Sequence, residues 1–178
     1  MKFVGDRKVA SEIVFTRRAA VLCAVALVLL VGCRKKDRGM SSMVSMADPS
    51  TATQLVSGFH AVEQNAWRWT MKKFSVVVKP PVGADQKGAT LRFKLFVSDD
   101  QLNRLGPITL SSEINGTPLD PETYSKAGDV VYSRPVPPEA LKGSSVKINF
   151  SLDKAREPDA VDGRQLGVVA SVIGLQPR

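Results

Sequence analysis

The stretch that decides the fold is Val146-Lys147-Ile148-Asn149-Phe150-Ser151-Leu152-Asp153, in which apolar and polar residues alternate without a break. Successive side chains of a strand point to opposite faces of its sheet, so this alternation places four apolar residues on one face and four polar residues on the other. The stretch therefore predicts a β-strand with one buried and one solvent-facing side.

The same alternation recurs earlier in the chain, in residues 74–78, 91–97, 108–114 and 130–132. The closing stretch, residues 166–175, is apolar on both faces, which is typical of a strand in the interior of a sheet. We expect this last strand to pair with the opening strand near Phe59 and Trp67. Deleting it should then unfold the domain.

Turn residues separate the expected strands. Asn115-Gly116 is the dipeptide favoured in type I′ hairpin turns, where both central residues need a positive φ. Only two short helical turns are expected, at residues 99–105 and 138–141. The fold class predicted for residues 54–178 is all-β, an antiparallel β-sandwich or jelly roll.

The amino-terminal part predicts export. Arg17-Arg18 precedes an apolar run at residues 19–31 that is too short to span a bilayer and is typical of a signal-peptide helix. Its end, Leu30-Val31-Gly32-Cys33, resembles a bacterial lipobox. The resemblance implies cleavage between Gly32 and Cys33, so that residues 1–32 are the signal peptide, and lipidation of Cys33 by diacylglyceryl and acyl groups such as palmitate. Export by the general or the twin-arginine pathway stays open.

Residues 33–53 are rich in Ser, Met, Ala and Thr and have no sustained period, which predicts a flexible tether. At its start, Arg34, Lys35, Lys36 and Arg38 are expected either to contact anionic lipid headgroups or to be solvated linker. The residue after Cys33 is Arg34, whereas an aspartate at this position would resemble an inner-membrane retention signal. We therefore expect an outer-membrane location in the cell envelope if the cell has two membranes.

Charge and cysteine content exclude several functions. Much of the formal charge of +8 lies in the signal peptide and the tether, and the remaining Lys and Arg are scattered, so nucleic acid is not an expected partner. Cys23 leaves with the signal peptide and Cys33 is acylated in this interpretation. An internal disulfide, thiol chemistry and cysteine-bound metals are therefore excluded from the mature chain.

No motif predicts an enzyme. His60 is the only histidine, no Gly-x-Ser-x-Gly elbow accompanies any serine, and no glycine-rich loop suits a phosphate. We expect no metal, no cofactor and no catalytic residue, and we interpret His60 as a strand or loop residue. Acidic residues that could form a glycosidase pair are interpreted as solvated surface, namely Glu63, Glu113, Glu122 and Asp129.

Three residues are candidates for ligand binding. Trp67 and Trp69 alternate in a predicted strand and so share a face, where they either close the core or offer an apolar platform for a sugar ring. Arg68 should face the opposite side, toward solvent or a carboxylate. Arg164 either reaches a ligand or pairs with an acid such as Asp162 or Glu63, and we favour the ion pair.

Several of these features together resemble one family. Gly58-Phe59-His60, Trp67-Arg68-Trp69, Asn115-Gly116 and the closing Asp162-Gly163-Arg164-Gln165-Leu166-Gly167-Val168 are similar to the β-sandwich accessory domains that accompany bacterial glycosyltransferases and envelope-polysaccharide proteins. Over about residues 56–176 the resemblance implies a galactose-binding-domain-like jelly roll. Two roles remain open, a glycan-binding module without catalytic activity and a structural lipoprotein that docks onto another envelope protein.

Overall fold

The computed structural model of the chain describes residues 39–178. The predicted signal peptide, the lipidation site at Cys33 and the basic residues Arg34, Lys35, Lys36 and Arg38 lie outside the described residues. None of the helices in residues 39–178 has the length and apolar character needed to cross a membrane.

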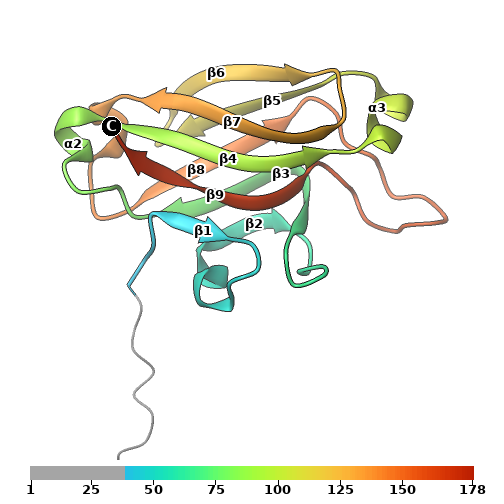
Figure 1. Cartoon of the computed structure of the whole chain (residues 1–178), viewed down its shortest axis with the longest axis horizontal. Coiled ribbons are helices and arrows are strands. Elements are labelled where there is room, and N and C mark those ends of the chain that lie inside the picture. Colours follow the sequence, from blue (N-terminus) through green and yellow to red (C-terminus); the bar gives the residue numbers. More distant parts are fainter. Residues whose placement is uncertain (1–38) are drawn as a thin grey trace, which may run out of the picture. The chain divides into compact units, whose positions relative to one another are not determined.

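The described residues form antiparallel strands joined by turns and a few helical segments (Figure 1). The strands are β1 Met43–Ser45, β2 Leu55–Phe59, β3 Arg68–Val78, β4 Ala89–Val97, β5 Ile108–Ile114, β6 Thr117–Tyr124, β7 Gly128–Val136, β8 Val146–Leu152 and β9 Val169–Pro177. The helical segments are the 3₁₀ helices η1 Pro49–Gln54 and η2 Pro138–Leu141 and the α-helices α2 Ala84–Lys87 and α3 Asp99–Leu105.

The strands build two layers that share β3. Its second half pairs with β8, and the first sheet runs β2-β3-β8-β5-β6. Its first residues, Arg68 and Trp69, pair instead with β9, and the second sheet continues through β4 to β7, with β1 beside β9. All of these pairings are antiparallel. The predicted all-β sandwich is therefore confirmed.

The core lies between the inner faces of the two sheets. Phe74 and Phe150 of the first sheet stack with ring centroids 4.9 Å apart, and Phe93 of the second sheet packs against them at 5.7 and 5.3 Å. All three are at most 2% exposed. Along β8 the apolar residues are buried while Lys147, Asn149 and Ser151 face outward, as the alternation predicted.

The last strand is interior, as expected, because β9 lies between β4 on one edge and β3 and β1 on the other. β9 pairs with β3 at Trp69, close to the expected Trp67. It does not pair with Phe59, which belongs to β2. It also begins at Val169 rather than at residue 166. Before Val169 the backbone has other partners: Leu166 forms an isolated antiparallel bridge with Arg156, and the carbonyls of Leu166 and Gly167 also accept hydrogen bonds from the buried Gln101 side chain of α3.

The turn predictions are confirmed at several places. Asn115 and Gly116 have φ values of 48° and 83° in the hairpin between β5 and β6, as a type I′ turn requires. The Ser98 hydroxyl accepts a hydrogen bond from the backbone N–H of Gln101 and caps the start of α3. The short helices α2 and η1 were not predicted from the sequence.

The flexible tether expected up to residue 53 is wrong for residues 39–53. Met43 pairs with Gly174 through β1, and Val44 and Met46 are at most 1% exposed. A Cβ on Gly174 would lie 2.2 Å from the Ser42 carbonyl oxygen, so glycine permits β1 to approach this closely. A three-residue strand is too short to show a period, which explains why the sequence pattern did not reveal it. The folded domain therefore begins near Gly39 instead of residue 54.

Candidate functional site

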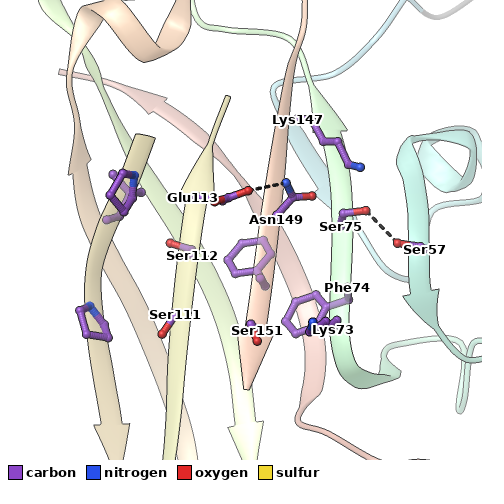
Figure 2. Close-up of a pocket in the computed structure, with 14 residues that line it drawn as sticks. Ser57, Lys73, Phe74, Ser75, Ser111, Ser112, Glu113, Lys147, Asn149 and Ser151 are labelled. Carbon is purple, nitrogen blue, oxygen red and sulfur yellow. Dashed lines mark hydrogen bonds between the residues drawn. The ribbon is translucent and has the colours of Figure 1, made fainter. Parts of the chain in front are cut away.

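A groove of about 600 Å³ lies on the outer face of the first sheet (Figure 2). It crosses all five strands of that sheet, which supply polar side chains in the middle and an apolar edge on β6. The lining residues are Ser57, Lys73, Phe74, Ser75, Ser111, Ser112, Glu113, Pro118, Leu119, Pro121, Lys147, Asn149, Phe150 and Ser151.

One row of residues crosses the groove from strand to strand. Ser57 of β2 lies opposite Ser75 of β3, which lies opposite Asn149 of β8. Asn149 in turn lies opposite Glu113 of β5, and Glu113 opposite Pro118 of β6. Directly paired residues of adjacent antiparallel strands point to the same face, so the sheet aligns these side chains across its width. We call these five residues the central row.

Two hydrogen bonds fix the polar side chains of the central row. The hydroxyl oxygens of Ser57 and Ser75 are 2.9 Å apart, and the Asn149 amide donates to Glu113 Oε1 at 2.9 Å (Figure 2). Among the described residues, no other hydrogen bond or ion pair involves Asn149 Oδ1 or Glu113 Oε2. Ser75 is only 3% exposed. The row therefore offers a molecule in the groove the Ser57 hydroxyl, the Asn149 amide and the Glu113 carboxylate, while Ser75 holds Ser57 in place.

Polar residues also flank the central row. On one side Ser151 lies opposite both Lys73 and Ser111. On the other side Lys147 lies two residues before Asn149, on the same face of β8. Neither lysine forms an ion pair within residues 39–178. Beneath the groove the stacked Phe74 and Phe150 pack into the core, so its floor is rigid.

The groove is suited to binding by hydrogen bonds. Its lining contains a single carboxylate, Glu113, so it lacks the pair of acids that glycoside hydrolysis needs. Glu122 is engaged elsewhere, in an ion pair with Arg134 at 2.7 Å. Residues 39–178 contain no cluster of three or more His, Cys, Asp or Glu able to hold a metal ion.

The two candidate tryptophans lie outside the groove. Their ring centroids are 6.1 Å apart with perpendicular planes, and both side chains are half-buried. They do not belong to the core cluster, and their perpendicular rings do not form one flat platform. Trp69 instead begins an apolar row across the second sheet, opposite Val169, which lies opposite Phe96. A ligand role for Trp67 and Trp69 stays a prediction.

Arg68 and His60 have local structural partners. Arg68 Nε donates to the Met46 carbonyl at 3.2 Å and Nη1 to the His60 carbonyl at 2.9 Å. The half-buried arginine therefore bonds to backbone carbonyls rather than to the carboxylate expected as one alternative. His60 lies in the loop after β2, and its Nε2 is 2.7 Å from the Gln165 carbonyl oxygen. These bonds join β1, the loop after β2 and the segment that leads into β9.

Arg164 forms the ion pair favoured from the sequence, and it does so with both acids. Its guanidinium donates to Asp162 at 2.9 Å and to Glu63 at 2.7 Å. These hydrogen bonds raise the pKa of Arg164, and the arginine lowers the pKa of Asp162. The pairing holds the segment before β9 against the hairpin at residues 63–67, away from the groove.

We expect Arg164→Ala to lower the melting temperature by a few degrees, because the pair is partly exposed and such pairs contribute little to stability. The matched control is Arg104→Ala, which removes a more exposed pair with Asp100 and should shift the melting temperature less. Thermal unfolding followed by circular dichroism measures both. Loss of ligand binding in Arg164→Ala at unchanged stability would make Arg164 a binding residue and contradict this assignment.

No family model matches the chain, and no curated protein matches it. Among the solved structures that match is one described as "CBM4 structure and function", a carbohydrate-binding module, at 11% identity. The match covers 76% of this chain and 85% of that chain, with a TM-score of 0.34. At this identity and score, the groove has to be interpreted from the residues of the chain itself.

Proposed function

We propose that this chain is a lipid-anchored, non-catalytic binding module of the bacterial cell envelope, and that it binds a glycan in the groove of the first sheet. The observation that carries the proposal is the central row, whose polar residues are aligned across four strands. Ser57, Asn149 and Glu113 present polar groups to the groove, and the buried Ser75 fixes Ser57. The lipobox at Cys33 supports the anchor, and the sequence of residues 17–33 supports export.

The chemistry of the groove matches that of a sugar chain. Sugar hydroxyls both donate and accept, so they can bond to Asn149 Oδ1 and Glu113 Oε2 as well as to the serine hydroxyls. Because the Asn149–Glu113 and Ser57–Ser75 bonds already fix these side chains, little conformational entropy is lost when a ligand binds. The volume of about 600 Å³ is also within the range of small-ligand sites, roughly 300–1,000 Å³.

Substitution of Asn149 tests the proposal. The full chain is screened on a glycan array, and the strongest ligand is titrated calorimetrically into the parent and into Asn149→Ala. We expect about tenfold weaker binding by the variant, because it loses its own contact with the ligand and also the bond that orients Glu113.

The matched control is Thr109→Ala, which changes a residue of the same sheet outside the groove lining. It should bind like the parent. Equal binding by Asn149→Ala and the parent, or no glycan bound by the parent, would refute the proposed function.

A second candidate function is docking onto another envelope protein. The row Trp69-Val169-Phe96 on the outer face of the second sheet favours it, because Phe96 is 37% exposed. Phe96→Ser distinguishes the two functions: it should leave glycan binding unchanged if the groove is the site, and it should abolish association with a partner if the second sheet docks.

A further inference from the structure

We propose that the end of the domain formed by residues 39–42, the loop at residues 79–83, α2 and η2 rests on an anionic membrane surface. In this arrangement Val82 inserts into the lipid interface, and the neighbouring lysines contact the headgroups. We call this end the basal end. The inference rests on the lipid anchor at Cys33, which is part of the proposed function, and adds how the domain is oriented.

The described chain begins at the basal end. The Ser41 carbonyl accepts a hydrogen bond from the Lys79 amide at 3.1 Å and another from the Gln54 side chain at 2.9 Å, so the first residues lie beside the loop at residues 79–83. Six residue steps separate Cys33 from Gly39. A chain of this length spans at most about 20 Å, so a lipidated Cys33 keeps the basal end close to the bilayer.

The basal end carries exposed apolar side chains. Val82 is 100% exposed, in a loop between Pro80-Pro81 and Gly83, which has a φ of 77°. Met40, at the start of the described chain, is 41% exposed. An apolar side chain at the tip of a turn gains most by entering the boundary between headgroups and acyl chains, where its surface leaves water while the turn backbone stays hydrated.

Charge is distributed to favour the same orientation. Residues of the basal end include the exposed Lys79, Lys87, Lys142 and Arg178, none of which forms an ion pair within residues 39–178. The acids nearby are Asp85 and Glu139. Arg178 belongs to this end because Pro177 pairs with Ala89 directly after α2, and Figure 1 shows the carboxyl terminus beside α2. Basic side chains next to an anionic bilayer are attracted to its surface.

The opposite end of the sandwich has more acids than bases, and several of its acids are in ion pairs with arginines. It includes α3, which begins with Asp99 and Asp100, and residues 153–168, which lead into β9 where Val169 pairs with Phe96. This second segment contains four acids and three bases: Asp153, Glu157, Asp159 and Asp162 against Lys154, Arg156 and Arg164. With Arg104 of α3, the two segments together hold six acids and four bases. An anionic surface therefore attracts the basal end, with its unpaired bases, more than this end, so the charges and the length of the chain favour the same orientation.

This orientation predicts how the groove is presented. With the basal end on the bilayer, the strands stand away from the membrane. The central row runs across the strands, so the groove opens sideways, and a glycan chain bound along the row runs parallel to the membrane surface.

The test uses the lipidated full chain bound to phosphatidylcholine vesicles with and without phosphatidylglycerol. Val82→Cys and, as a matched control at the opposite end, Val161→Cys each carry an environment-sensitive fluorophore; Val161 is 91% exposed in the parent. The parent chain without an introduced cysteine gives the background signal. We expect a blue shift and several-fold stronger quenching by brominated lipid for the Val82 probe than for the Val161 probe, with the larger difference on vesicles containing phosphatidylglycerol.

A second variant tests the role of the charges. Lys79→Glu combined with Lys87→Glu and Lys142→Glu should remove most of the quenching at Val82 while the Val161 signal stays constant. Flotation of the parent and of Cys33→Ser reports the anchor separately. If the parent floats, Cys33→Ser does not, and the two probes are quenched equally, the orientation is overturned and the anchor stands. If the parent does not float, the orientation and the anchor are both overturned. Glycan binding in the groove is tested separately, by its own titration.

Discussion

A chain shortened by residues 164–178 is expected to show no cooperative thermal transition. The deletion removes β9, which pairs with β4 along its whole length and with β1 and β3 on its other edge. It also removes the core side chains of Val168, Ile173 and Leu175, which are at most 1% exposed. Three strands, β4, β1 and β3, lose backbone partners when β9 is removed, so the loss of stability is much larger than for a terminal tail.

Circular dichroism and the dispersion of the amide NMR signals measure this loss. The matched control removes only Arg178, which is exposed and follows the last paired residue, and should melt like the parent. A sigmoidal melt and dispersed signals for the chain ending at residue 163 would show that β9 is dispensable and that the described sheet order is wrong.

Phe93→Ala is expected to destabilise the domain by about 3–5 kcal/mol, the usual cost of truncating a buried phenylalanine. Phe93 is fully buried and is the residue of the second sheet that packs against both Phe74 and Phe150. The truncation therefore leaves a cavity at the point where the two layers meet.

Phe96→Ala is the matched control, because Phe96 lies on the same strand, faces the opposite side and is 37% exposed. Phe96→Ala should lower the free energy of unfolding much less than Phe93→Ala does. Chemical denaturation of both variants gives the free energies of unfolding. Similar losses in the two variants would contradict the assignment of the inner and outer faces of β4.

The sequence was a reliable guide to strands with a clear period. Alternation in residues 146–152 predicted which side chains of β8 face the core, and Asn115-Gly116 predicted the hairpin between β5 and β6. It failed at β1, where three residues cannot show a period and burial of Val44 depends on pairing with the distant β9.

The groove could not be predicted in the same way. Asn149 and Ser75 were each assigned to the polar face of a strand, but nothing in the sequence shows that β8 lies between β3 and β5. Sheet order alone aligns these residues with Glu113. Conversely, Trp67 and Trp69 were candidates because they are close together in the sequence. In the structure β3 passes from one sheet to the other, so Trp69 lies in the second sheet, away from the groove.

The most direct test of the central claim is a map of amide chemical-shift changes in the chain as the best-binding oligosaccharide is added. The account predicts that the largest changes fall on the central row and its flanks, with Ser75, Glu113 and Asn149 among them. Changes concentrated at Trp67, Trp69 and Arg164, with the central row unaffected, would contradict it.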